Sequence, residues 1–165
     1  MKTTITFIGN GNMALSIAQG LKDQYSIEVV GRNMAKLEAF EEALGCSIEK
    51  SFLNNFDVDG KTLLLCVKPY NLVEVGQQLR GRAKVLYSVL AGTTLDALAD
   101  HIKTEAVVRA MPNLAATVQR SMTTLTGDVD YQEDAELPYQ RYWSEFLVYG
   151  PVGFLSESWQ PYFEY

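Results

Sequence analysis

The sequence has few of the residues that usually mark metal sites and disulfide-stabilised folds. Its 165 residues include two cysteines and one histidine. Cys46 and Cys66 form neither a CxxC pair nor a Cys/His ligand set, and both lie in apolar surroundings. We therefore expect reduced core cysteines in a cytoplasmic protein. His101 lies on an expected surface helix without an obvious carboxylate partner, so we assign it no catalytic role and expect no bound metal.

Positive charge is also scarce, with 14 Lys and Arg against 20 Asp and Glu and a net charge of -6. Because nucleic acids and anionic lipids are bound by clustered Lys and Arg, we expect neither as a partner. Any bound anion must be held locally by a few groups. No apolar run approaches the roughly 20 residues of a membrane span, and the N-terminal run is too short for a secretory signal. These absences favour a small-molecule substrate and no membrane contact.

The sequence does contain a regular alternation of two patterns. With 47% hydrophobic and 21% charged residues, the chain suits one domain whose core needs no disulfides. Continuous apolar runs, typical of parallel strands covered on both faces, occur at residues 5–8, 27–30, 63–67, 85–89 and 106–108. Helical patterns lie between them, at residues 13–21, 34–44, 70–79 and 95–102. The alternation predicts an α/β fold with a doubly wound, mostly parallel sheet.

The remaining segments are less regular. Residues 54–60 form a polar, turn-rich link, and residues 127–136 form an acidic loop. We expect a last helix at residues 139–146 and a last short strand at residues 152–155. The final residues, 159–165, include four aromatic side chains, which is unusual at the end of a soluble domain and resembles a junction to a further segment.

A glycine-rich turn lies between the first expected strand and the first expected helix. It matches the pattern G-x-G-x-x-A with the residues Gly9, Asn10, Gly11, Asn12, Met13 and Ala14. The first glycine permits a tight turn, the second lets backbone N–H groups approach a pyrophosphate, and the small sixth residue keeps helix and strand close. The anion then lies at the positive end of the helix. Small residues also serve ordinary strand-to-helix turns, but the position of this one in the alternating pattern favours dinucleotide binding.

The end of the second expected strand indicates which dinucleotide is bound. NAD-binding proteins place an acidic residue there on the ribose 2'-hydroxyl, whereas this sequence has Arg32 and Asn33, and Glu28 lies too early in the strand. No carboxylate is expected at this position. Arg32 could pair with a 2'-phosphate and Asn33 could donate a hydrogen bond. The alternative is that Arg32 is simply a solvated loop residue. We therefore expect NADPH as the cofactor, with NADH possible.

Three further motifs follow, each at the end of an expected strand. They are Val67-Lys68-Pro69, then Ser88-Val89-Leu90-Ala91-Gly92, and then Arg109-Ala110-Met111-Pro112-Asn113. Open α/β sheets bind ligands at this edge. With the glycine turn, this series resembles the pyrroline-5-carboxylate reductase family over roughly residues 4–127. The resemblance implies a Rossmann-type domain and a reductase of proline biosynthesis, which passes hydride from NAD(P)H to the C=N bond of 1-pyrroline-5-carboxylate.

The resemblance also implies roles for these motifs. Val67, Lys68 and Pro69 are expected to pass the nicotinamide ribose, and Ala91 with Gly92 to let the nicotinamide ring approach. Met111, Pro112 and Asn113 are expected near the substrate. Each residue also has an ordinary structural interpretation: an exposed strand-end lysine, a strand-terminating proline and a core methionine. No residue is assigned as the proton donor, so the catalytic residues stay unassigned.

Two features depart from the family pattern. The family usually continues Thr-Pro after Met-Pro-Asn, whereas this chain has Leu114-Ala115, followed by residues 116–120 where a glycine-containing turn is common. The family also has a helical C-terminal domain that forms the homo-oligomer and completes the substrate site. We expect residues 1–155 to be the NAD(P)-binding domain and residues 156–165 to be the junction to that missing domain, so that this chain alone has little or no reductase activity.

Two alternative functions remain open at this point. One is a related NADP-dependent dehydrogenase of the hydroxyacid-dehydrogenase type, which would share the glycine turn but is not expected to carry both VKP and RAMPN. The other is a non-catalytic NADP-binding module whose aromatic tail docks a partner.

Overall fold

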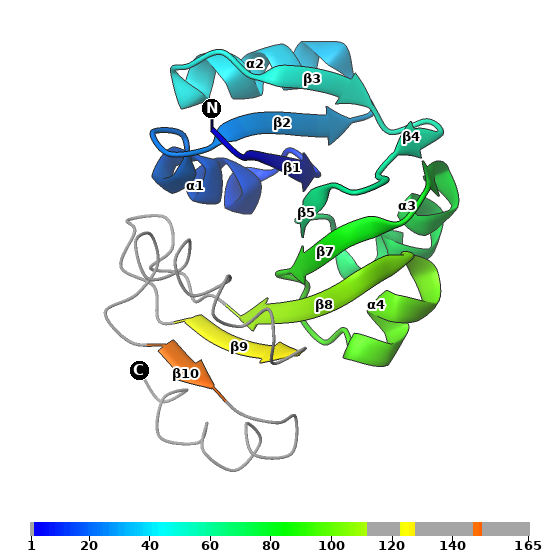
Figure 1. Cartoon of the computed structure of the whole chain (residues 1–165). Coiled ribbons are helices and arrows are strands. Elements are labelled where there is room, and N and C mark those ends of the chain that lie inside the picture. The colour runs from blue at the N-terminus through cyan, green and yellow to red at the C-terminus, as the bar shows by residue number, and fades with distance from the viewer. Residues whose placement is uncertain (1, 112–122, 128–146, 150–165) are drawn as a thin grey trace.

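The computed structural model describes residues 2–111, 123–127 and 147–149 (Figure 1). The helices are α1 (Asn12–Leu21), α2 (Met34–Leu44), α3 (Leu72–Gln78) and α4 (Leu95–His101), with a 3-10 turn η1 (Pro69–Asn71) before α3. The strands of the main sheet are β1 (Thr4–Ile8), β2 (Ser26–Gly31), β3 (Glu49–Phe52), β5 (Thr62–Leu65), β7 (Ala83–Ser88), β8 (Thr104–Met111), β9 (Thr123–Gly127) and β10 (Leu147–Tyr149). Two short strands, β4 (Phe56–Asp57) and β6 (Leu79–Arg80), pair with each other.

The main sheet has the strand order β10-β9-β8-β7-β5-β1-β2-β3. All its pairs are parallel except β8 with β9, which is antiparallel. β1 pairs with β2 on one side and with β5 on the other, so the direction of winding reverses at β1. The predicted doubly wound, mostly parallel α/β sheet of the Rossmann type is therefore confirmed.

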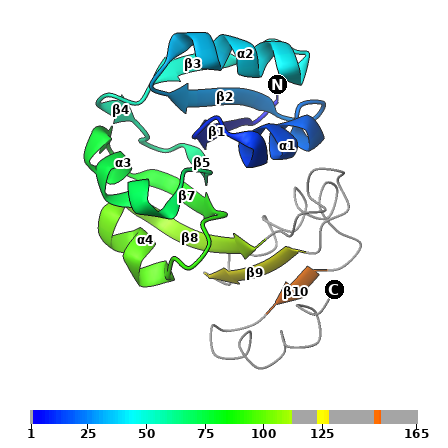
Figure 2. The same cartoon turned by 180° about the vertical axis from the view of Figure 1, so that it is seen from behind.

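Helices cover both faces of the sheet. α1 and α2 lie beside β1, β2 and β3, while α3 and α4 lie beside β5, β7 and β8 (Figures 1 and 2). Successive strand residues face opposite clusters: Phe7 packs in the core with α1 and α2, and Ile8 packs in the core with α3 and α4. This division explains why the strands have continuous apolar runs, because both sides of each strand are buried.

The four helices expected between residues 13 and 102 and the five strands expected between residues 5 and 108 are present, with small changes at their ends. The expected helix at residues 70–79 begins instead as η1 and ends at Gln78, since Leu79 belongs to β6. β3 was not predicted, because its sequence Glu-Lys-Ser-Phe has no apolar run and its strand lies at the edge of the sheet. Within the expected link at residues 54–60, Phe56 and Asp57 form β4.

The C-terminal expectations have mixed outcomes. β9 and β10 were not predicted, and Gly127 ends β9 rather than beginning a loop. The expected helix at residues 139–146, the expected strand at 152–155 and the aromatic tail lie outside the described residues. No helix in the described part of the chain is long and apolar enough to cross a membrane.

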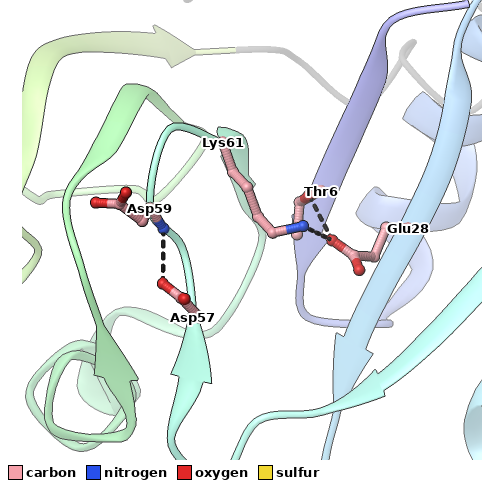
Figure 3. A network of polar contacts seen from close by, with 5 residues as sticks. All are labelled: Thr6, Glu28, Asp57, Asp59 and Lys61. Carbon is pink, nitrogen blue, oxygen red and sulfur yellow. Dashed lines mark hydrogen bonds and ion pairs between the residues drawn. The ribbon is translucent and has the colours of Figure 1, made fainter.

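A buried carboxylate joins β1 and β2 to the segment before β5. Glu28, which is 5% exposed, accepts a hydrogen bond from Thr6 Oγ1 at 2.7 Å and forms an ion pair with Lys61 Nζ at 3.0 Å. Figure 3 shows these contacts beside the Asp57–Asp59 turn, where the Asp59 N–H donates to Asp57 Oδ1. Lys61 Nζ also lies 5.5 Å from the centroid of the Phe56 ring. Since a buried charge is costly unless it is paired, Lys61 and Thr6 make Glu28 tolerable in the sheet.

Candidate functional site

The predicted site residues lie at the carboxyl edge of the sheet. The glycine turn follows β1, Arg32 follows β2, Val67 to Pro69 follow β5, and Ala91 with Gly92 follow β7. The reversal of winding at β1 separates the loops after β1 and β2 from those after β5 and β7. In open α/β sheets, a crevice for ligands forms at this reversal.

Gly9 is held tightly between the ends of two neighbouring strands. Its N–H donates to Val30 O at 3.1 Å, and the Cys66 N–H donates to Ile8 O at 2.9 Å. Gly9 has a φ of 112°, and a Cβ at this position would lie 2.9 Å from Cys66 O and 3.2 Å from a methyl carbon of Val67. Only glycine fits both the backbone conformation and the space. The first glycine of the motif is therefore required by the fold itself.

Gly11 has no such structural requirement. It is the N-cap residue of α1 with φ -81°, a conformation open to any residue, and within the described part of the chain a Cβ there would meet no atom within 4 Å beyond its chain neighbours. The absence of a side chain leaves the backbone at the start of α1 accessible. Dinucleotide-binding turns need open backbone of this kind for the pyrophosphate to approach.

The surroundings of the first turn of α1 also suit a bound anion. Among the described residues no side chain caps this helix, and its first turn has no acidic residue. By contrast, Asn33 caps α2 and Thr94 caps α4. The N–H groups of a first helical turn lack partners within the helix and carry a partial positive charge. A bound phosphate would satisfy them, so the residues present fit the dinucleotide.

The other residues of the glycine-rich turn hold that turn against β2 and the core. Ala14, in the first turn of α1, is 1% exposed, and half-buried Met13 packs against the same core. The Asn10 side chain lies beside Gly31 at the end of β2, with Oδ1 3.6 Å from the position of a Cβ on Gly31. Asn12 is the exposed first residue of α1. The motif thus contacts both β2 and the core, as the prediction of a strand-turn-helix unit requires.

Arg32 is not the isolated cation that the sequence suggests. Its Nη1 lies 3.2 Å from Glu74 Oε1 on α3, and the two side chains are 51% and 55% exposed. No acidic residue directly follows β2 in the sequence, as expected, but the fold brings the Glu74 carboxylate to Arg32 from a distant part of the sequence. Glu74 belongs to none of the sequence motifs, so nothing in the sequence indicated that it contacts Arg32.

Asn33 has an ordinary structural role at this edge. Its Oδ1 accepts a hydrogen bond from the Lys36 N–H at 3.1 Å and caps α2. The capping interaction accounts for Asn at this position without a ligand. The side-chain amide nitrogen is the group of Asn33 suited to donate to a phosphate oxygen.

The segment after β5 extends over the edge of the sheet. Lys68 is extended (φ -71°, ψ 144°) and exposed, as expected for the residue before a proline. Pro69 begins η1, and the Asn71 N–H donates to Lys68 O at 2.9 Å. Val67 is half-buried against the core beneath α3 and α4. Tyr70 is the most exposed large apolar side chain on the segment, at 82%.

The turn after β7 presents backbone rather than side chains. Ala91 and Gly92 are exposed, and Gly92 has φ 61°. Thr93 Oγ1 donates to Ala91 O at 3.1 Å, while Ser88 Oγ accepts from the Leu90 N–H at 3.2 Å. These contacts fix the turn, and within the described residues no atom lies within 4 Å of a Cβ built on Gly92. A planar ring can therefore approach the backbone here.

The last motif lies partly outside the described residues. Met111 ends β8, whereas Pro112, Asn113 and the departure at Leu114-Ala115 are not described. Arg109 lies in β8 opposite Ser88 of β7, and burial lowers the pKa of its guanidinium. Cys66, at the end of β5, is a free cysteine whose thiol pKa is raised by burial. A thiol of this kind is a poor nucleophile.

A family model described as NADP oxidoreductase coenzyme F420-dependent matches residues 4–92, more than half of the chain. Among curated proteins, the pyrroline-5-carboxylate reductase of Helicobacter pylori strain J99 is 32% identical over 126 residues, covering 73% of this chain and 48% of the relative. The pyrroline-5-carboxylate reductase of Glycine max is 30% identical over 173 residues, covering 98% and 59%. The chain thus spans about half the length of the curated relatives it matches.

Solved structures show the same fold. The 1-pyrroline-5-carboxylate reductase of Streptococcus pyogenes superposes with a TM-score of 0.72 at 23% identity, covering 89% of this chain and 58% of that one. The pyrroline carboxylate reductase of Plasmodium falciparum, solved with NADP bound, gives a TM-score of 0.66 at 12% identity, covering 94% and 60%. These likenesses confirm the fold class that the sequence predicts.

Proposed function

The chain belongs to the NADP oxidoreductase coenzyme F420-dependent family, its curated relatives are pyrroline-5-carboxylate reductases, and we propose that it binds the cofactor of such a reductase. The activity proposed for the whole protein is the reduction of 1-pyrroline-5-carboxylate to proline. The observation that carries the cofactor-binding part of this proposal is the open backbone at Gly11, at the start of α1, where no side chain among the described residues caps the helix; the proposed activity rests on the curated relatives. We extend the proposed NAD(P)-binding domain over residues 1–155.

In this proposal Gly9, Asn10, Gly11, Asn12, Met13 and Ala14 hold the pyrophosphate. The N–H groups at the start of α1 donate to the phosphate oxygens, and the partial charge of the helix end favours the anion. Gly9 contributes by the turn that it allows, and Ala14 by the close packing of helix and strand.

At the adenosine end, Arg32 binds the 2'-phosphate and Asn33 donates a further hydrogen bond. A guanidinium is suited to a phosphate because it offers several donors in one plane. The half-exposed position of Arg32 after β2 supports this role, as does its location at the strand end where NAD-binding proteins hold the 2'-hydroxyl. NADPH is accordingly the proposed cofactor, and NADH is accepted less well.

At the nicotinamide end, Val67, Lys68 and Pro69 border the ribose, while the exposed backbone at Ala91 and Gly92 receives the ring. Met111, Pro112 and Asn113 are proposed to lie beside the substrate. The cofactor, when bound, supplies the hydride that reduces the imine. The chain's own part is to orient the donor and exclude water, because hydride transfer depends mainly on alignment.

Calorimetric titration of the 165-residue chain with NADP+ and with NAD+ tests the proposal, with Arg32→Ala as the matched variant. We expect tighter binding of NADP+ by the unmodified chain and a selective loss of NADP+ affinity in Arg32→Ala. The loss corresponds to about tenfold or more, since a charge-assisted hydrogen bond contributes about 1.5–3 kcal/mol. Failure of both dinucleotides to bind would contradict the proposal.

A further inference from the structure

The ion pair between Arg32 and Glu74 joins two parts of the sheet that a dinucleotide must bridge. Arg32 follows β2, on one side of β1, whereas Glu74 lies in the first turn of α3, which follows β5 on the other side. Their side chains meet at 3.2 Å, and both remain about half exposed. The carboxylate therefore stands beside the cation to which the proposed function assigns the 2'-phosphate.

The stability of the fold gives little reason for this contact. Exposed ion pairs contribute little to stability, because both charges stay hydrated and both long side chains lose freedom. Glu74 also does not cap α3, since no side-chain capping hydrogen bond is found for that helix among the described residues. Its carboxylate contacts the guanidinium of Arg32 instead. The contact occupies the guanidinium to which the proposed function assigns the 2'-phosphate.

We propose that Glu74 is a specificity-determining residue, which reduces the preference of this site for a 2'-phosphorylated dinucleotide. The inference rests on the proposed function of Arg32. A 2'-phosphate must either displace the Glu74 carboxylate from Arg32 or bind beside it, and both arrangements cost free energy because the two groups are negative. A 2'-hydroxyl carries no charge and leaves the ion pair in place. Glu74 thus lowers the affinity for NADP(H) and leaves that for NAD(H) almost unchanged.

The test is a calorimetric comparison of Glu74→Gln with the unmodified chain, using NADP+ and NAD+ as separate ligands. Gln retains the size of the side chain and removes its charge. We expect NADP+ to bind about two- to fivefold more tightly, the range typical of an exposed ion pair, and NAD+ to change by less than about twofold. The gain in NADP+ affinity should shrink as salt is added, because the charges are exposed.

Two controls separate this effect from a general change in charge or fold. Glu42→Gln removes the same charge from the exposed last turn of α2 and is expected to leave both affinities unchanged. In the double variant Arg32→Ala/Glu74→Gln, compared with Arg32→Ala, the gain is expected to be smaller, because no ion pair remains to be broken and only the repulsion between the phosphate and Glu74 is relieved. Thermal unfolding of all variants is expected to match the unmodified chain closely.

The outcomes distinguish this inference from the proposed function. If the unmodified chain binds NADP+ in an Arg32-dependent way but Glu74→Gln binds it equally well, the role of Glu74 is wrong and the proposed function stands. An equal gain for NADP+ and NAD+ likewise overturns the role of Glu74. If neither the unmodified chain nor Glu74→Gln binds either dinucleotide, both ideas are overturned.

Discussion

The carbonyl oxygen of Cys66 lies against Gly9, at a position that would be only 2.9 Å from a Cβ on that residue. Gly11, two residues further on, has open space where its side chain would be. The two glycines of one motif thus have different reasons to be glycine. Gly9 is needed for β1, β2 and β5 to meet, whereas Gly11 is needed only if something else approaches the backbone.

Alanine substitutions separate these two reasons. Gly9→Ala is expected to destabilise the fold by about 3 kcal/mol, because it combines steric overlap with an unfavourable φ. Gly11→Ala is expected to leave stability equal or slightly higher, since alanine restricts the unfolded chain, and to weaken dinucleotide binding by at least about tenfold. Urea unfolding and calorimetric titration measure the two effects. A Gly11→Ala variant that binds NADP+ normally would argue against the approach of a pyrophosphate at Gly11.

Gly76 in α3 is the contact point between two helices on one face of the sheet. A Cβ on this residue would overlap the carbonyl oxygen of His101 at the end of α4. Replacing glycine by alanine inside a helix normally stabilises by about 1 kcal/mol. Here we expect Gly76→Ala to destabilise by about 1–3 kcal/mol, because α3 must move away from α4. The measurement is the free energy of unfolding of Gly76→Ala. A lower value than that of the unmodified chain supports the prediction, and a higher value contradicts it.

Glu28 depends on Lys61 as its counter-charge inside the sheet. We expect Lys61→Met to destabilise by about 2 kcal/mol, less than for a fully buried pair because Lys61 is partly exposed. The double variant Glu28→Gln/Lys61→Met is expected to recover much of this loss, since the uncompensated charge is gone. Denaturant unfolding of the single and double variants measures the coupling. Additive effects would mean that the two charges do not act as a pair.

The Glu41 carboxylate is a second partnered acid, at the junction of α2 and β3. It accepts hydrogen bonds from Lys50 Nζ at 2.6 Å and from the Ile48 N–H at 2.9 Å, which together lower the pKa of Glu41 below its ordinary value of 4.5. A lowered pKa stabilises the fold above the ordinary value, and this contribution is lost as the pH falls through the folded-state pKa.

We therefore expect the unmodified chain to be more stable than Glu41→Gln near neutral pH. The difference in the free energy of unfolding should shrink as the pH falls below about 4.5. Urea unfolding at a series of pH values measures it, with Glu42→Gln on the same helix as the charge-matched control. A difference that does not depend on pH would show that the Glu41 carboxylate contributes nothing through its charge.

The Cys66 thiol should react slowly in the folded protein, because burial raises its pKa and leaves little thiolate. In a Cys46→Ser variant, alkylation by N-ethylmaleimide should be at least roughly 100-fold slower when folded than in guanidinium, as expected from a large loss of thiolate. Rapid reaction of the folded variant would mean that the end of β5 is open to solvent.

The local parts of the fold could be predicted from the sequence. The turn from β1 to α1 is encoded by glycine spacing within a few residues, and the central strands are encoded by continuous apolar runs. The parallel pairing of the sheet follows from the alternation of strands and helices, because parallel strands need crossover connections. The positions of Gly9, Gly11 and Arg32 at the carboxyl edge could therefore be predicted from the same pattern.

The edge strands and the contacts between residues distant in the sequence could not be predicted from the sequence. β3 is short and polar at the edge of the sheet, so it carries no periodic signal. The pairing of Arg32 with Glu74 depends on how α3 lies against the end of β2, and neither residue type at its position indicates the other. β9 has β-branched threonines typical of a strand, but its antiparallel pairing with β8 departs from the repeating unit on which the prediction was based.

β1 is synthesised before the other described strands of the sheet, and it lies in the interior of the finished sheet, between β5 and β2. One of its edges is paired by residues 26–31, but the other stays open until residues 62–65 have been made. Parallel pairing of this kind closes long loops before it gains contacts, so the sheet should form more slowly than a helical bundle of similar size. During that interval the open edge of β1 can pair with another molecule.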